Sequence, residues 1–95
     1  MNAVLRRRGA AEAGAIFVKI DHLDGWATVY GPAPQSILVE LEPADDRTFT
    51  RAHREGRIGS DKADERLARE VEFDPDLWIV EVEGAEAPAW LNLAA

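Results

Sequence analysis

Residues 15–31 read AIFVKIDHLDGWATVYG and place two runs of apolar and β-branched residues on either side of Asp24-Gly25. An Asp-Gly pair between two alternating apolar runs is a strong short-range signal for a β-hairpin. A two-residue turn at Asp24-Gly25 would pair Leu23 with Trp26, and this pairing predicts two distinct faces. The predicted core face carries Ile16, Val18, Ile20, Ala27 and Val29, and the predicted aromatic face carries Phe17, Lys19, Asp21, Leu23, Trp26, Thr28 and Tyr30.

Proline and turn residues divide the chain after the hairpin into short elements. Residues 31–34 (GPAP) interrupt the sheet, because proline lacks the N–H donor that a strand ladder needs. Strands are expected over 36–42, where apolar residues alternate with glutamate, and over 47–53, where threonine and phenylalanine favour an extended chain. Residues 77–83 (LWIVEVE) carry apolar side chains on both faces, which indicates a central strand.

One helix is expected over about 60–72. Ser60 or Asp61 can cap its first turn, and Pro75 ends it because the residue before a proline avoids the helical region. A narrow apolar stripe recurs every fourth residue at Ala63, Leu67 and Val71. We expect Trp78, in the strand that follows, to be buried beside this stripe.

Strands followed by one helix and a final strand predict an α+β fold. The expected architecture is an antiparallel-dominated twisted sheet of about five or six strands, with the helix packed on one face. A length of 95 residues with 46% apolar content predicts a single domain over 1–95. Because Trp90, Leu91 and Leu93 are poorly suited to a free tail, we expect the C-terminal segment to dock on its own domain or on a partner.

The charge and cysteine content limit the partners and the location. The formal net charge is −7, and residues 60–95 hold ten acidic side chains against three basic ones. This excess argues against nucleic acid as a partner, and no apolar run is long enough to span a membrane. With no cysteine there is no disulfide framework, so a cytoplasmic location is expected.

Four segments taken together resemble a known family. They are Arg7-Arg8-Gly9, Glu12-Ala13-Gly14, Tyr30-Gly31-Pro32-Ala33 and Phe73-Asp74-Pro75-Asp76-Leu77-Trp78. In this combination, which spans nearly the whole chain, the sequence resembles the domain of unknown function 1491 family of small bacterial proteins. The resemblance implies no activity, cofactor or partner, because that family has none assigned. It also implies that relatives tend to carry an additional segment before the strand containing Val4 and Leu5, so this chain is expected either to lack an opening element or to rely on a neighbour to cover the exposed edge.

Motifs for the major cofactor classes are missing from the sequence. There is no P-loop, dinucleotide-binding glycine pattern, nucleophile elbow or metal-spaced His/Cys set, so we predict no cofactor and no metal site. His22 and His53 are the only histidines, and a structural role is favoured for both because no catalytic partner can be named.

Two sets of residues remain as candidate sites. The polar set comprises Arg8, Glu12, Asp74 and Asp76, because two carboxylates on a rigid proline turn suit a bound cation or an acid/base pair. The favoured interpretation of this turn is nevertheless structural, with Asp74 or Asp76 held by an arginine. The interaction set comprises Phe17, Leu23, Trp26, Tyr30 and Trp90, because protein interfaces are enriched in aromatic anchors.

Two functions therefore stay open from the sequence. The first is a non-enzymatic protein-interaction module, which we predict to be a homodimer formed through a sheet edge or through the aromatic face. The alternative is a small enzyme or ligand-binding module built around the polar set. The alternative requires the polar set to converge in a concave site, whereas the interaction module requires an exposed apolar patch.

Overall fold

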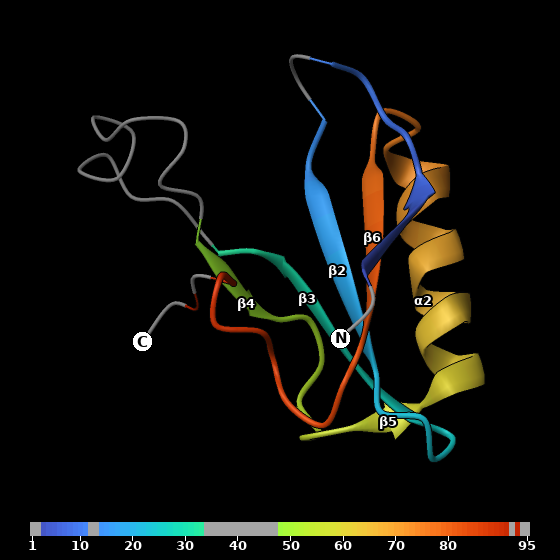
Figure 1. Ribbon diagram of the computed structural model, residues 1–95. Helices are drawn as coiled ribbons and strands as arrows, with labels where there is room; N and C mark the ends of the chain where they lie inside the picture. The colour runs from blue at the N-terminus through green and yellow to red at the C-terminus, as the bar shows by residue number, and fades with distance from the viewer. Residues whose placement is uncertain (1–2, 12–13, 34–47, 92, 94–95) are drawn as a thin grey trace.

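The computed structural model describes residues 3–11, 14–33, 48–91 and 93, and in these ranges six strands form one sheet beside one helix (Figure 1). The strands are β1 (Ala3–Arg7), β2 (Ile16–Asp21), β3 (Trp26–Pro32), β4 (Phe49–Arg51), β5 (Ile58–Gly59) and β6 (Trp78–Glu83), and the helix is α2 (Ser60–Phe73). The sheet order is β1-β6-β2-β3-β4, and β5 also pairs with β3. Among the described strand pairs, β2 and β6 are parallel and the others are antiparallel; an isolated parallel bridge also joins Phe49 and Leu93. The predicted α+β fold is confirmed.

Strand β6 lies inside the sheet, between β1 and β2. The prediction of a central strand at 77–83 is therefore confirmed. The predicted strand at 36–42 lies outside the described residues. Of the strand predicted at 47–53, residue 47 lies outside the described residues, and Phe49–Arg51 is observed as β4. Within the described residues, no helix combines the length and the apolar composition needed to cross a membrane.

The turn of the β2–β3 hairpin contains three residues rather than two. The amide of His22 donates to the carbonyl oxygen of Trp26 (N···O 3.0 Å), which encloses residues 23–25. Leu23 adopts a left-handed backbone conformation (φ 65°), and its amide donates to the Asp21 carboxylate (2.9 Å). An aspartate side chain that accepts a hydrogen bond from the amide two residues later in the chain stabilises a turn locally. Here the Asp21 carboxylate stabilises the three-residue turn in this way.

The longer turn changes which side chains share a face. Ile20 pairs with Thr28 rather than with Val29. Because side chains alternate along a strand, this shift of one residue moves every β3 side chain to the opposite face relative to β2. The predicted core and aromatic faces are therefore wrong. The face covered by α2, here called the helix face, carries Phe17, Lys19, Ala27 and Val29, and the opposite face, here called the tail face, carries Ile16, Val18, Ile20, Thr28 and Tyr30.

The helix face forms a closed core. Its buried residues are Ala27, Val29, Ala63, Leu67, Leu77 and Ile79. The predicted stripe is confirmed at Ala63 and Leu67, but the predicted side-chain cap is wrong: the N-cap is Gly59, and the amide of Ser60 donates to the carbonyl of Gly25 (2.9 Å).

The prediction for Trp78 is also wrong. Leu77 and Ile79 face α2, so the alternation of the strand places Trp78 on the other side, where it is only partly buried.

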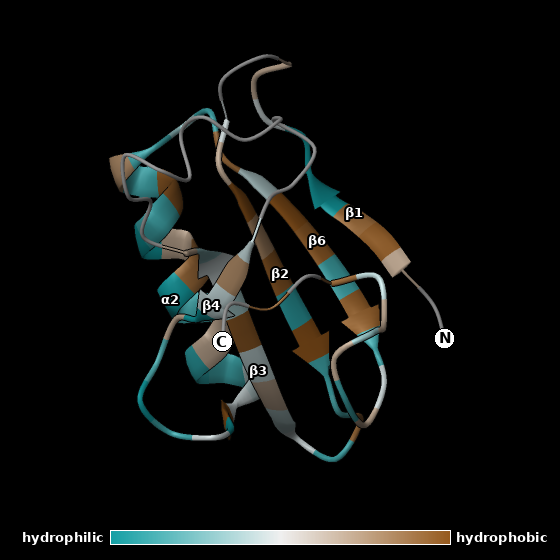
Figure 2. Ribbon diagram, turned by 90° about the vertical axis from the view of Figure 1, so that its left-hand side faces the viewer, coloured by the Kyte–Doolittle hydropathy of each residue, from teal (hydrophilic) through white to brown (hydrophobic). Residues whose placement is uncertain are grey.

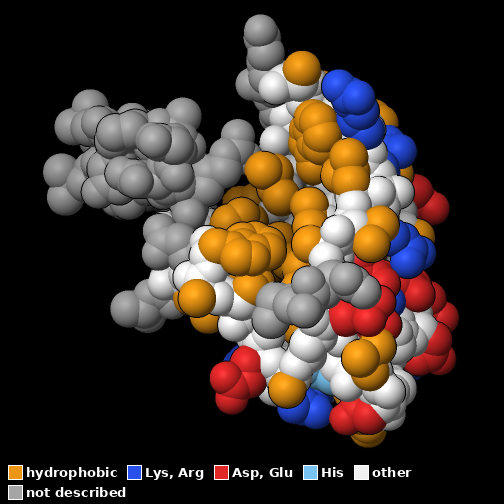
Figure 3. Space-filling view, in the orientation of Figure 1, with side chains coloured by type: hydrophobic (Ala, Val, Ile, Leu, Met, Phe, Trp, Pro, Cys, Tyr) orange, Lys and Arg blue, Asp and Glu red, His pale blue; other side chains and the backbone are white. Residues whose placement is uncertain are grey.

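The tail face is covered by irregular chain. Its buried cluster is Val18, Ile20, Val82 and Leu91. Leu91 is only 5% exposed, so the C-terminal segment docks on its own domain as one of the two predicted possibilities. Figure 2 shows the sheet from this side, with residues 84–91 crossing it beyond the end of β6. Figure 3, in the orientation of Figure 1, shows hydrophobic side chains gathered in the middle of the view, whereas charged side chains lie mainly around its margin.

Candidate functional site

The Asp74-Pro75-Asp76 turn follows α2 and is held by its own hydrogen bonds. The amide of Asp74 donates to the carbonyl of Glu70 (2.9 Å) and ends the helix. The Asp74 carboxylate accepts the amide of Asp76 (3.1 Å), and its carbonyl accepts the amide of Leu77 (3.2 Å). The carboxylate of Asp74 therefore stabilises the turn itself.

The segment after β1 packs against this turn. Arg7 Nη2 donates to the carbonyl of Pro75 (2.6 Å), and the amide of Ala10 donates to the carbonyl of Asp76 (3.0 Å). A Cβ at Gly9 or Gly14 would collide with the same Asp76 carbonyl, so both glycines permit the close approach. An arginine does hold the turn, but through a backbone carbonyl and not through a carboxylate as predicted.

The predicted polar set is only partly brought together. Asp74 and Asp76 share the turn, and Arg8 lies exposed on the neighbouring segment, with no described contact to either carboxylate. Glu12 lies outside the described residues. A ligand-binding role for this set stays a prediction.

The predicted interaction set is divided between two faces. Phe17 lies on the helix face and packs against the helix-face core, whereas Tyr30 packs against the tail-face cluster. Leu23, Trp26 and Trp90 are 68%, 50% and 60% exposed. These residues do not form one continuous aromatic surface, because the hairpin register separates Phe17 from Tyr30.

A different apolar surface lies on the tail face near β1. It consists of Leu5, Ile16, Trp78 and Val80, here called the open sheet surface. Leu5 pairs with Val80 across β1 and β6, and Ile16 pairs with Trp78 across β2 and β6, so the four residues are contiguous. Leu5 is 51% exposed and the other three are partly buried.

Lys19 is buried on the helix face, with 4% of its surface exposed. Its ammonium lies 2.8 Å from the Asp64 carboxylate and 3.6 Å from that of Glu81, and Glu81 also pairs with Arg6 at 3.2 Å. A buried charge requires such partners, so this cluster ties β1, β2, β6 and α2 together. Sequence reasoning missed it, because nothing in the local pattern around Lys19 names its distant partners.

His53 extends the hydrogen bonding of β3 beyond the end of β4. The amide of Val29 donates to His53 Nε2 (3.0 Å), and His53 Nδ1–H donates to the carbonyl of Glu55 (2.8 Å). Burial lowers the pKa of His53 below its ordinary value of 6.5; the bond to Glu55 acts in the opposite direction, and the Arg51 charge adds to the lowering. The neutral ring is therefore a structural element of the sheet.

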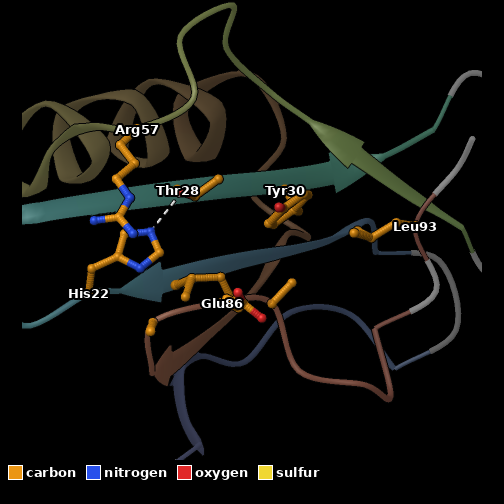
Figure 4. A pocket seen from close by; sticks show the side chains of 9 residues that line it. His22, Thr28, Tyr30, Arg57, Glu86 and Leu93 are labelled. Carbon is orange, nitrogen blue, oxygen red and sulfur yellow. Dashed lines mark hydrogen bonds between the residues drawn. The ribbon is translucent and has the colours of Figure 1, made fainter.

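A pocket of about 390 Å³ opens on the tail face between the β2–β3 hairpin and the C-terminal segment (Figure 4). The residues that matter to its chemistry are Ile20, His22, Thr28, Tyr30, Arg57 and Glu86. Sequence reasoning missed this site for two reasons. Arg57 and Glu86 come from separate loops, and the predicted register placed Thr28 and Tyr30 on the wrong side relative to Ile20.

The described residues contain no group of three or more His, Cys, Asp or Glu side chains arranged to hold a metal ion. The pocket instead combines one cation, one carboxylate and two hydroxyl groups with an apolar floor.

Comparison with known proteins identifies the family. The family model described as "Protein of unknown function (DUF1491)" matches residues 1–92. The chain belongs to this family. The resemblance found in the sequence is thereby confirmed. Among curated proteins no match was found.

Solved structures of other proteins share the fold. The solution structure of protein Atu0922 from A. tumefaciens is 37% identical, with a TM-score of 0.76, and the match covers 97% of this chain and 77% of that protein. A crystal structure of a DUF1491 family protein from Caulobacter crescentus is 26% identical, with a TM-score of 0.71 and coverage of 99% and 80%. An NMR structure of a DUF1491 family protein from the same organism is 27% identical, with a TM-score of 0.72 and coverage of 98% and 79%.

Proposed function

We propose that this protein is a non-enzymatic self-association module that forms a homodimer through the edge strand β1. The observation that carries the proposal is the exposure of β1, where Val4 and Leu5 remain 53% and 51% exposed. Figure 2 shows β6 on one side of β1 and no described strand on the other. An unpaired edge offers backbone donors and acceptors to a second chain, and the exposed apolar side chains would be covered by the same contact.

The sequence of β1 suits antiparallel pairing with its own copy. With Leu5 at a two-fold axis, each Leu5 lies opposite the other Leu5, and Arg6 of each chain lies opposite Val4 of the other. The cationic ends of the two strands then point in opposite directions, which limits their repulsion. The ion pair of Arg6 with Glu81 (3.2 Å) limits it further. Two-fold pairing of this kind is the commonest closed assembly of identical chains.

The ladder with β6 is irregular between Leu5 and Arg7. A bulge of this kind ends regular pairing, so the dimer would use mainly the backbone of Ala3 to Leu5. Such a short strand pair needs additional apolar contact. The open sheet surface provides it, because Leu5 belongs both to the edge and to that surface, and the two-fold axis brings the two surfaces side by side.

The alternative of an enzyme or ligand-binding module around Arg8, Glu12, Asp74 and Asp76 has weaker support. The carboxylate of Asp74 is engaged within its own turn, and the backbone of that turn is engaged by the segment after β1. These contacts favour a structural role for the turn.

Sedimentation velocity of the unmodified protein and of two variants tests the proposal. We expect the unmodified protein to sediment at twice the chain mass of 10.5 kDa at high micromolar concentration. Leu5→Glu should weaken association by at least about tenfold, because a buried apolar contact becomes a buried charge. Leu23→Glu makes the same chemical change at a hairpin tip that is 68% exposed, and this variant should remain a dimer.

Circular dichroism should show both variants folded, because both positions are exposed in one chain. A monomeric unmodified protein at high micromolar concentration would contradict the proposal. Dimerisation of Leu5→Glu as tight as that of the unmodified protein would contradict it equally.

A further inference from the structure

The tail-face pocket is separate from the proposed dimer, because it lies over β2 and β3 whereas the dimer uses β1. We propose that this pocket binds a small apolar α-amino acid, with Arg57 holding the carboxylate and Glu86 the ammonium group. A volume of about 390 Å³ lies at the lower end of the range for small-molecule sites. The pocket is thus suited to a ligand of this size.

Two of the polar side chains in the pocket are already committed to the protein. His22 Nδ1 donates to the carbonyl of Gly84 (2.9 Å), and Nε2 is bonded to the hydroxyl of Thr28 (2.8 Å). The same hydroxyl lies 3.2 Å from the carbonyl of Gly56. Since both ring nitrogens are hydrogen-bonded, the His22 side chain is fixed in place. It links the C-terminal segment to the hairpin through Gly84, and Thr28 links the Gly56 loop to the hairpin.

Three other polar groups lie open to a ligand. Arg57 pairs only weakly with Asp24 (3.4 Å), because both side chains are about half exposed. The Tyr30 hydroxyl and the Glu86 carboxylate make no hydrogen bond or ion pair with another described residue. Figure 4 shows Arg57 at one end of the pocket beside His22, with Tyr30 and Glu86 on opposite sides further along.

The combination of charges selects the class of ligand. The guanidinium of Arg57 favours a carboxylate or a phosphate, which it can bind through two parallel hydrogen bonds. Glu86 in the same small pocket would repel a dianionic phosphate, and a simple carboxylate would make no favourable contact with Glu86. A zwitterion satisfies both charged groups at once.

The floor selects an apolar side chain. Ile20 lies beneath the pocket but is fully buried by the chain itself, so the apolar surface that a ligand would meet comes from Ala87 and the ring of Tyr30. Figure 4 places Leu93 at the end opposite Arg57. An aliphatic side chain would therefore extend along the floor from the charged end toward Leu93.

Titration of the uniformly ¹⁵N-labelled protein with three matched probes tests the proposal. The probes are L-leucine, 4-methylpentanoate, which lacks the amine, and 3-methylbutylamine, which lacks the carboxylate. We expect leucine to shift the amide signals of His22, Thr28 and Ala87, with a dissociation constant on the order of 1 mM or below. Each single-charge analogue should bind at least about tenfold more weakly, because it loses one of the two charge-assisted contacts that leucine makes.

Two variants assign the roles of the charges. Arg57→Gln and Glu86→Gln should each weaken leucine binding by roughly tenfold or more. Two control variants change charges outside the pocket. Arg54→Gln removes a cation from the same loop as Arg57, and Glu72→Gln removes an exposed carboxylate from α2. Because neither residue lines the pocket, both variants should bind leucine as the unmodified protein does.

Three results would overturn the proposal. They are the absence of leucine-dependent shifts at these amides, equal binding of 4-methylpentanoate, and leucine binding that is unchanged in Arg57→Gln. None of them bears on the dimer, whose test depends on Leu5.

Discussion

The two faces of the sheet are closed in different ways. On the helix face, α2 provides a regular stripe of small and apolar residues, and Lys19, the one buried charge among the described residues, is paired with carboxylates. On the tail face, an irregular segment covers only part of the surface and leaves a pocket and the open sheet surface. The helix face is thus closed by a regular element, whereas the two proposed binding sites lie on the tail face and at its β1 edge.

The largest expected effect lies on the helix face. Leu67→Ala removes a side chain that is enclosed between α2 and the sheet, and it should lower the free energy of unfolding by about 3–5 kcal/mol. Urea unfolding followed by circular dichroism measures this loss. Leu23→Ala at the exposed hairpin tip is the control and should change stability by less than about 0.5 kcal/mol.

A smaller effect is expected for the matching change on the tail face. Leu91→Ala also removes a buried leucine, but the segment that carries it is irregular and can settle into the space. We expect a loss of about 1–3 kcal/mol by the same measurement. A loss as large as that of Leu67→Ala would show that both faces are equally essential to folding, and the contrast drawn between them would be wrong.

The smallest effect concerns His53, which is bonded to β3 at the sheet margin. The lowered pKa means that the unfolded chain takes up a proton near pH 6.5, whereas the folded chain does so only at lower pH. The free energy of unfolding should therefore be level above about pH 6.5 and fall as the pH drops below it.

His53→Gln keeps a donor and an acceptor but cannot titrate. The fall in the free energy of unfolding at low pH should therefore be smaller in this variant. Urea midpoints of both proteins at about pH 7.5 and about pH 5.5 provide the comparison. If the urea midpoint of the unmodified protein changes between these two pH values no more than that of His53→Gln, His53 does not have this role.

Much of the fold could be predicted because its signals are local. The hairpin follows from Asp24-Gly25 between two apolar runs, the helix from a stripe at every fourth residue, and the central strand from apolar residues on both faces. The hairpin register could not be predicted in this way. It depends on the left-handed conformation of Leu23 and on the bond between its amide and the Asp21 carboxylate.

The shift of one residue in the hairpin register changed which side chains share a face. It separated Phe17 from Tyr30, so the predicted aromatic face does not exist as one surface. The pocket was beyond sequence reasoning because its walls come from the hairpin, the loop before β5 and the C-terminal segment. Only the folded chain brings His22, Arg57 and Glu86 together.

Amide hydrogen exchange in β1 tests most directly whether this edge is a binding surface. In one chain, alternate β1 amides face β6 and the others point away from the sheet. We predict that the outward amides of Ala3 to Leu5 are protected at high micromolar concentration and lose protection on dilution, and that Leu5→Glu needs a concentration at least about tenfold higher for the same protection. Outward amides that exchange at one rate at all concentrations of the unmodified protein would contradict the proposed dimer.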